Sequence, residues 1–260
     1  MVERFWREER GDGPLVAVAI HHGHDVREEV ADLLALSDAD RLREEDPYTG
    51  DWTVIAPTRV INHRSRFEVD LNRPRSRAVY RKPEDAWGLQ VWKRKPAESL
   101  IRRSLAQYDA FYAAMRDLLE QVERDTGRFV IFDLHTYNHR REGPQAAPAD
   151  PEGHPQVNVG TGTMDRSRWG GIVDRFVAAL GEYEFPGGRL DVRENVKFRG
   201  GRFSRWVHET FPASGCALAI EFKKFFMDEW TGEPEASLLR AIEDALRSTV
   251  PGVIESLERL

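Results

Sequence analysis

Histidine side chains follow two apolar runs of the chain. His21 comes directly after Leu15–Ile20, and His135 lies shortly after Phe129–Phe132, with Asp133 two residues before it. Imidazole is a common zinc ligand, and catalytic zinc sites use three protein ligands and leave a further position for water. On an extended segment Asp133 and His135 would point to the same side, so Asp133 could accept the far ring hydrogen of a histidine. We therefore expect His21 and His135 to bind zinc.

The third zinc ligand has two possible sources in the sequence. His24 lies three residues after His21, a spacing that can close on one metal ion from a turn. The acidic group Glu44, Glu45 and Asp46 precedes a Pro-x-x-Gly sequence, which indicates a turn at a helix end. A solvated acidic face is an equally good interpretation of that group. Three other histidines lack a comparable setting, and we expect no metal role for them: His63, His154 and His208.

Segment 65–74 carries side chains suited to an anionic ligand. Arg66 and Arg73 bracket it, and Asn72 adds an amide. A guanidinium group matches a carboxylate bidentately, so these residues near a metal would hold a small acidic substrate and stabilise an oxyanion. The alternation of apolar and polar residues over 67–71 predicts a half-buried strand. Taken alone, the segment would fit a strand with two surface salt bridges better.

A second polar cluster spans Asn195 to Gly201 and includes Arg199. Its two glycines, Gly200 and Gly201, permit a close backbone approach or a positive φ angle. We interpret the cluster as a substrate-binding loop that presents Asn195 and Arg199. An ordinary turn is an equal alternative.

Buried strands are expected to position these groups, and three short apolar runs predict them: Leu15–Ile20, Phe129–Phe132 and Ala217–Ile220. Runs of this length, rich in β-branched and aromatic residues, are typical of strands buried on both faces. They lead to His21, to Asp133 with His135, and to Glu221, respectively. Because ligands of open α/β sheets bind outside the carboxyl ends of the strands, we expect these side chains to converge.

Helical spacing of apolar residues occurs between the predicted strands, and four segments show it: Val26–Leu36, Leu100–Glu123, Trp169–Leu180 and Ala236–Leu246. The last of these should end near Pro251, with a short final helix reaching Leu260. Segment 143–162 is rich in Pro and Gly and predicts a long surface loop, either a lid or pocket wall or a mobile insertion. Strands that alternate with helices predict an α/β sandwich.

Composition limits the classes of function. A chain of 260 residues fits a single α/β domain over 1–260, and a net charge of -6 argues against nucleic acid as a main partner. The single cysteine, Cys216, excludes an internal disulfide and a Cys-rich zinc site, and it fits a cytoplasmic protein. No apolar run approaches the roughly 18 residues of a membrane span.

Taken together, these motifs make the sequence resemble the N-formylglutamate amidohydrolases, which are related to zinc carboxypeptidases and aspartoacylase-like deacylases. The likeness covers most of the chain, and five elements in the same order are far more specific than one. The elements that carry it are His21-His22-Gly23, Ser65-Arg66-Phe67 with Asp70-Leu71-Asn72-Arg73-Pro74, Asp133-Leu134-His135, Asn195 with Gly200-Gly201, and Glu221. The resemblance implies a three-layer α/β sandwich with a mixed sheet, similar to that of the zinc carboxypeptidases.

The resemblance also implies roles for individual residues. His21 and His135 would bind Zn²⁺, and Arg66 would polarise the scissile carbonyl. Asn72 and Arg73 would hold a substrate carboxylate. Glu221 would be the general base that deprotonates the attacking water and passes the proton to the leaving amine. The alternative for Glu221 is a strand-end acid paired with a neighbouring lysine, Lys223 or Lys224.

The chain departs from the wider deacylase pattern at one position. Those relatives carry His-x-x-Glu at the end of the first strand, whereas this sequence has His24 at the fourth position. Either His24 replaces the glutamate, or Glu45 or Asp46 supplies the ligand. N-formylglutamate amidohydrolases carry an acidic segment after the first helix, which favours Asp46 while His24 stays a candidate.

The implied reaction is hydrolysis of the amide of a small acidic N-acyl amino acid, most simply N-formyl-L-glutamate to formate and glutamate. The first alternative is a zinc carboxypeptidase, or a different N-acyl amino acid deacylase, that uses the same residues. A non-catalytic protein that binds an acidic metabolite is the alternative from a different class. Such a protein would have no reason to keep His21, His135 and Glu221 together.

Overall fold

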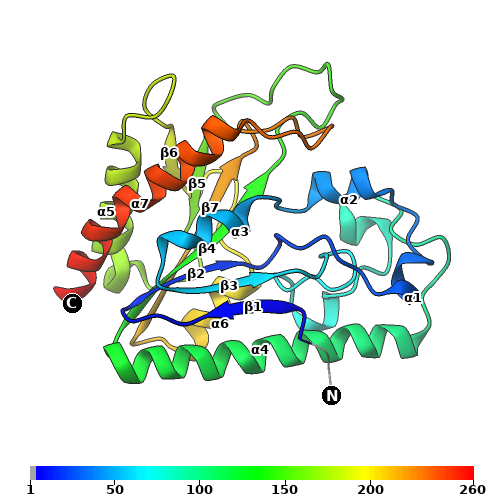
Figure 1. Ribbon diagram of the computed structural model, residues 1–260, viewed down its shortest axis with the longest axis horizontal. Helices are drawn as coiled ribbons and strands as arrows, with labels where there is room; N and C mark the ends of the chain where they lie inside the picture. The colour runs from blue at the N-terminus through cyan, green and yellow to red at the C-terminus, as the bar shows by residue number, and fades with distance from the viewer. Residues whose placement is uncertain (1–3) are drawn as a thin grey trace.

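The computed structural model describes residues 4–260 and contains one mixed sheet of seven strands in the order β1-β3-β2-β4-β7-β5-β6 (Figure 1). Strands β3, β2, β4 and β7 are mutually parallel, whereas β1 and β5 run antiparallel to their neighbours β3 and β7. Strand β6 is parallel to β5. The strands are β1 (Trp6–Glu9), β2 (Leu15–Ala19), β3 (Thr58–Asn62), β4 (Phe129–Tyr137), β5 (Val157–Gly160), β6 (Val192–Glu194) and β7 (Gly215–Lys223).

Helices cover both faces of the sheet, as Figure 1 shows, with α4 and α6 on one side and α5 and α7 on the other. The α-helices are α1 (Glu28–Ala31), α2 (Asp38–Glu44), α3 (Thr49–Trp52), α4 (Glu98–Thr126), α5 (Arg166–Glu182), α6 (Arg202–Thr210) and α7 (Ala236–Glu258). Three short 3₁₀ helices complete the set: η1 (Thr53–Ile55), η2 (Arg75–Arg77) and η3 (Pro83–Ala86). This arrangement confirms the predicted three-layer α/β sandwich with a mixed sheet.

The central strands explain why their sequences are continuously apolar. On β4, Val130 and Phe132 pack in the core under α5 and α7, while Phe129 and Ile131 pack in the core under α4 and α6. Side chains of a strand alternate between its two faces, so a strand covered on both sides needs apolar residues at every position. The three predicted strands are therefore confirmed as β2, β4 and β7.

Two helix predictions were wrong in extent. The segment Val26–Leu36 is helical only in α1, because Leu34 pairs with Trp92 in an isolated bridge that draws the chain out of the helix. Helix α7 continues through Pro251 to Glu258 without a separate final helix. Proline removes one helical hydrogen bond, and the buried residues Val253 and Leu257 beyond it keep the last turns packed on the core.

Two loop and strand predictions also need correction. Segment 65–74 forms consecutive turns rather than a half-buried strand, and Phe67 to Leu71 are buried without a gap. The polar residues of the alternation, Glu68 and Asp70, point inward because they find buried partners there, so the alternation does not mark a solvent face. Segment 143–162 is a loop only up to residue 156, after which β5 joins the sheet.

Within residues 4–260, no helix combines the length and the apolar character that crossing a membrane requires.

Candidate metal centre

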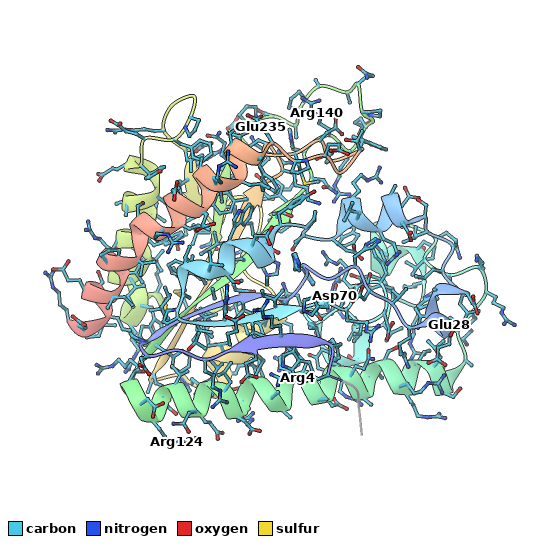
Figure 2. All side chains as sticks on the ribbon, in the orientation of Figure 1. Arg4, Glu28, Asp70, Arg124, Arg140 and Glu235 are labelled. Carbon is cyan, nitrogen blue, oxygen red and sulfur yellow. The ribbon has the colours of Figure 1, made fainter. Side chains whose placement is uncertain are left out.

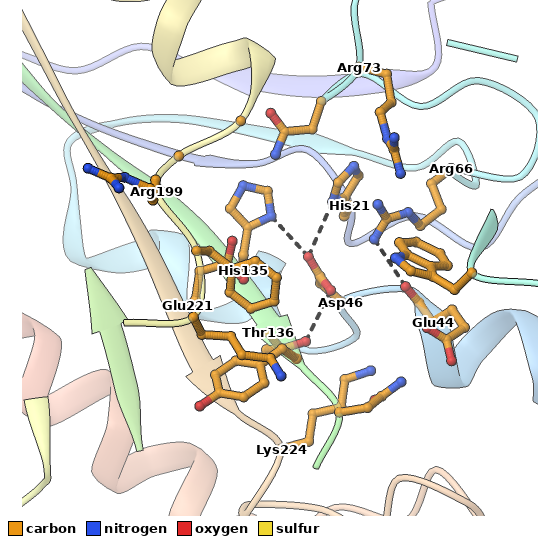
Figure 3. Close-up of a pocket in the computed structure, with 18 of the residues that line it drawn as sticks. His21, Glu44, Asp46, Arg66, Arg73, His135, Thr136, Arg199, Glu221 and Lys224 are labelled. Atoms are coloured by element: carbon orange, nitrogen blue, oxygen red, sulfur yellow. Dashed lines mark hydrogen bonds and ion pairs between the residues drawn. The ribbon is translucent and has the colours of Figure 1, made fainter. Parts of the chain in front are cut away.

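Two histidines and one aspartate meet at the ends of the central strands (Figure 3). Their ligand atoms all lie within 4.8 Å of one another. The Nδ1 atoms of His135 and His21 lie 3.0 Å and 3.4 Å from Oδ2 of Asp46. All three side chains are buried, and each comes from a different segment: the end of β2, the turn after α2, and β4. The structure thus brings together two histidines and the acid that the sequence offered as a third ligand.

His135 lies inside a strand rather than just past its end. Strand β4 keeps its pairing with β7 as far as Tyr137 and Lys223, so the extended backbone continues beyond the apolar run. The sequence suggested an earlier end because the residues after Phe132 are polar. Their side chains are buried all the same, and they form the centre of the site.

The outer nitrogen of each imidazole faces a second buried carboxylate. His21 Nε2 is hydrogen-bonded to Asp70 Oδ1 at 2.7 Å, and His135 Nε2 lies 2.9 Å from Asp133 Oδ1. Ser204 on α6 donates to the other oxygen of Asp133 at 3.0 Å. Carboxylates in this position fix the orientation of a ligating imidazole and leave its inner nitrogen for the metal.

Sequence reasoning found Asp133 but assigned Asp70 to the polar face of a strand. Asp70 is completely buried, whereas Glu28 and Arg124 lie at the surface (Figure 2). The available signal was the position of Asp70 in the Asp70–Pro74 element, two residues before Asn72. Its role depends on a tertiary contact with His21 across 49 residues of chain, which the periodicity of segment 65–74 does not encode.

The Asp46 carboxylate is ionised in this environment. Burial alone would raise its pKa, but hydrogen bonds from His135 and His21 outweigh that effect and hold the pKa far below its usual range. Thr136 donates to the other carboxylate oxygen, Oδ1, at 3.2 Å. The remaining carboxylate oxygen, Oδ2, is the one that faces both imidazoles.

The donor set fits a divalent metal ion. Two imidazole nitrogens and one carboxylate oxygen form the set of three protein ligands that catalytic zinc sites use, with a further position left for water or substrate. The inner faces of His21, Asp46 and His135 line a cavity of about 520 Å³, so that position would be accessible. Nitrogen and carboxylate ligands also suit other divalent ions, and the geometry alone does not select zinc.

His24 and Glu45, the other two candidates for the third ligand, lie outside this group. His24 Nδ1 is hydrogen-bonded to Glu45 Oε2 at 2.5 Å, and the same carboxylate accepts from Ser65. Arg41 lies at the other ring nitrogen of His24, with its Nη2 3.1 Å from Nε2, and its Nη1 donates to the His24 carbonyl at 2.8 Å. His24 and Glu45 are hydrogen-bonded to each other beside the site, and neither side chain reaches the metal-binding atoms.

A close backbone approach explains the glycine of the His-x-Gly element. A Cβ atom on Gly23 would lie 2.1 Å from the carbonyl carbon of His63, so no other residue fits there. This contact sets the course of the chain after β2. His21 then faces Asp46, while His22 faces α3 and accepts a hydrogen bond from the Gly50 amide at 3.2 Å.

Cationic side chains dominate the lining of the cavity, whose acidic residues are Glu44, Asp46 and Glu221. Six cations contribute to it, from four separate segments of the described chain: Arg66, Arg73, Arg141, Lys197, Arg199 and Lys224. A cavity with this balance favours an anionic ligand over a neutral one.

Arg66 is held firmly at the cavity wall. Its Nη2 donates to Asp70 Oδ2 at 3.0 Å and its Nη1 to the Glu44 carbonyl at 3.2 Å. The guanidinium carbon lies 4.8 Å from the ring centroid of Trp87, within cation–π range. Asp70 therefore contacts both a candidate ligand, His21, and the predicted carbonyl-polarising residue.

Asn72 and Arg73 also line the cavity, next to Arg66. Asn72 Oδ1 accepts from the backbone amide of Phe203 at 3.0 Å, at the start of α6. A Cβ atom on Gly201 would lie 2.2 Å from that oxygen, so the glycine makes room for the amide. The second glycine of the Gly-Gly pair, Gly201, is thus explained by its contact with Asn72 rather than by contact with a ligand.

The loop from Asn195 to Gly201 contributes to the cavity only in part. Arg199 lines it, although its guanidinium group points away from Asp46 and His135 in Figure 3. Asn195 does not line it: its side chain accepts from the Thr161 amide at 2.9 Å and donates to the Thr161 hydroxyl. The structure thus places Asn195 outside the lining of the cavity. It anchors the loop to the end of β5 instead.

Glu221 lines the cavity beside the histidines, and no salt bridge links it to Lys223 or Lys224 in the described residues. Desolvation raises the pKa of Glu221 to about 7, and the charges of Asp46 and Asp133 act in the same direction. A carboxylate with a pKa near neutrality is suited to accept and return a proton.

The mixed sheet, the buried His–Asp–His set and the adjacent carboxylate define an α/β protein with a candidate metal centre. Sequence comparison supplies the particular family. The model of the N-formylglutamate amidohydrolase family matches residues 13–227, so the chain belongs to that family. This result confirms the resemblance that the motifs predicted.

Solved structures agree with the fold. N-formylglutamate amidohydrolase from Ralstonia eutropha JMP134 has a TM-score of 0.75 at 17% identity, covering 98% of each chain. A gene product from Agrobacterium tumefaciens has a TM-score of 0.69 at 18% identity, covering 98% of this chain and 97% of that one. No curated protein sequence matches this chain.

Proposed function

We propose that this protein is a zinc-dependent amidohydrolase that cleaves the amide bond of N-formyl-L-glutamate to give formate and glutamate. The observation that carries the proposal is the convergence of the His21 and His135 Nδ1 atoms on one oxygen of Asp46, in a cavity that Glu221 also lines. Membership of the N-formylglutamate amidohydrolase family supports the same activity.

His21, Asp46 and His135 would hold the zinc ion, and Asp70 and Asp133 would orient the two imidazoles. When bound, zinc supplies Lewis acidity and lowers the pKa of coordinated water toward about 7. The three ligands leave room on the cavity side for the reacting groups.

Glu221 is proposed as the general base. Its carboxylate accepts a proton from the water that attacks the acyl carbon, and it returns that proton to the amine nitrogen as the C–N bond breaks. Burial raises the pKa of Glu221, and a carboxylate whose pKa lies closer to the working pH can both accept and return a proton. Arg66 stabilises the negative charge that develops on the acyl oxygen.

The cationic lining supports an acidic substrate. Asn72 and Arg73 are proposed to bind the α-carboxylate of the substrate, as segment 65–74 predicts. A substrate with a second carboxylate would find further cations in the same lining, on the segments of Arg141, Lys197 and Arg199. Two carboxylates and a short acyl group describe N-formylglutamate.

A purified-protein experiment tests the proposal. We expect about one zinc ion per chain, and equal amounts of formate and glutamate released from N-formyl-L-glutamate. Chelation should stop the reaction and added zinc should restore it. His135→Ala should lose both zinc and activity, whereas the control His63→Ala, at an exposed site away from the cavity, should keep both.

The substrate assignment is tested separately with N-acetyl-L-glutamate, N-formyl-L-leucine and the dipeptide glycyl-L-glutamate. N-formyl-L-glutamate should have the highest kcat/KM of the four. Faster cleavage of the dipeptide would assign the site to a carboxypeptidase, and full activity after exhaustive chelation would refute the metal-dependent mechanism.

A further inference from the structure

Lys224 is a buried lysine beside the metal-binding residues. It follows β7 directly and is 1% exposed, although lysine is almost never fully buried without a partner. Its Nζ donates to two backbone carbonyls, that of Arg43 at 2.5 Å and that of Glu45 at 2.8 Å. The ammonium group therefore binds the last turn of α2, where carbonyl groups lack helical partners and attract a positive charge.

The Glu45 carbonyl belongs to the peptide unit that leads into Asp46. The other end of that unit, the Asp46 amide, donates to the backbone carbonyl of His21 at 2.9 Å. A peptide unit is planar, so holding both its oxygen and its hydrogen fixes its orientation. Lys224, after β7, and His21, after β2, thus hold the peptide that carries Asp46 from opposite sides.

From this geometry, and resting on the proposed function, we propose that Lys224 is a positioning residue that orients Asp46 for metal binding. Without the Lys224 ammonium group, the carbonyl of Glu45, a fully buried residue, would be left without this hydrogen bond. The peptide would rotate to recover a partner, and the Asp46 carboxylate would move away from the imidazoles. The hydrogen bond from Thr136 reaches only Oδ1 of Asp46 and would not by itself keep Oδ2 facing the imidazoles.

Charge and position have opposite effects at this site, which makes the role testable. Lys224 lines the same cavity as Asp46, so its positive charge repels a bound cation. If Lys224 acted only through its charge, neutralising it would strengthen zinc binding. If it positions Asp46, the same change weakens zinc binding.

The test measures the zinc dissociation constant of Lys224→Met by competition with a chromogenic chelator, independently of activity. We expect binding to weaken by about 10–100-fold, the range typical of residues that orient metal ligands. Lys224→Arg keeps a donor group and should recover part of the loss. Unchanged or tighter zinc binding by folded Lys224→Met would overturn the proposal.

Lys223→Met is the matched control. Lys223 is the preceding residue, and its Nζ donates to the His154 carbonyl at 3.0 Å, away from α2. Its zinc affinity should equal that of the wild type, and an equal loss in both variants would overturn the proposal. Circular dichroism and thermal melting check folding. If Lys224→Met does not fold, Lys224→Gln, too short to hold both carbonyls, is judged by the same measurement.

The wild-type measurement separates the two levels of inference. A wild-type protein that neither binds zinc nor hydrolyses N-formyl-L-glutamate would refute the proposed function. A wild type that does both, together with a Lys224→Met variant of unchanged affinity, would refute only the role of Lys224.

Discussion

His135 and Glu221 occupy opposite positions in the parallel pair formed by β4 and β7. The register of this pair is continuous from Phe129 opposite Gly215 to Tyr137 opposite Lys223. Side chains at opposite positions lie on the same face of the sheet, and a shift of one residue would turn Glu221 to the other face. Strand pairing alone therefore places the candidate base beside a candidate metal ligand, independently of any loop.

Replacing Glu221 with Gln should abolish most turnover without loss of metal. Glutamine keeps the shape of the side chain but cannot accept the proton from water, so kcat should fall by about 10²–10⁴-fold. Kinetics on N-formyl-L-glutamate and metal analysis of the same preparation measure both effects. Glu194→Gln on β6, which weakens contacts with Arg166, Thr161 and Asn195 outside the cavity, should retain activity. Loss of zinc in Glu221→Gln would identify Glu221 as a ligand instead of a base.

Asp70→Asn should weaken zinc binding by about 10–100-fold. The Asp70 carboxylate accepts from His21, from the Arg66 guanidinium and from the Asn72 amide, at 2.7, 3.0 and 2.8 Å. Asparagine has only one acceptor oxygen and no charge, so the His21 imidazole would lose its fixed orientation. Competition with a chelator measures the affinity.

Glu68→Gln is the control for this experiment. Glu68 is equally buried, lies two residues before Asp70, and pairs with Arg27 at 2.6 Å instead of with a candidate ligand. The melting temperature of both variants should be lower than that of the wild type, because each substitution weakens an ion pair between an arginine and a buried carboxylate. Only Asp70→Asn should lose zinc affinity, and an equal loss in both would reduce Asp70 to a general stabilising residue.

The fold was predictable from sequence where one interaction dominates. The runs Leu15–Ile20, Phe129–Phe132 and Ala217–Ile220 are apolar at every position because helices cover both faces of the sheet, so their sequence alone identified β2, β4 and β7. Helix α4 was predictable for a related reason, since its buried positions repeat at helical spacing.

Prediction failed where tertiary contacts override the local pattern. Residues 67–71 alternate like a strand, but Glu68 and Asp70 pair with arginines inside the protein, so no face of these five residues meets solvent. For the same reason the sequence left the third ligand open. Asp46 and His135 are 89 residues apart, and only the turn after α2 decides whether Glu45 or Asp46 faces the histidine.

The acid sensitivity of folding should depend on His208. Its Nε2 accepts from the Ala217 amide at 3.0 Å, so the ring is neutral, and its Nδ1 lies 3.0 Å from the Thr163 hydroxyl. Desolvation lowers the pKa of His208 from 6.5 to about 4. Below pH 6.5 the unfolded chain therefore binds a proton that the folded chain does not. Stability falls as the pH drops from about 6.5 to about 4, by at most about 3 kcal/mol.

His208→Gln should flatten this part of the pH profile, because the Gln amide can serve both partners without binding a proton. Denaturant unfolding of chelator-treated protein at about pH 7 and about pH 5 measures the change, which should be about 2 kcal/mol smaller in His208→Gln than in the wild type. The exposed His63 provides the control, since His63→Gln should keep the wild-type pH dependence. Identical profiles for all three proteins would show that acid weakens the fold elsewhere, with His208 already protonated or free to move out to solvent.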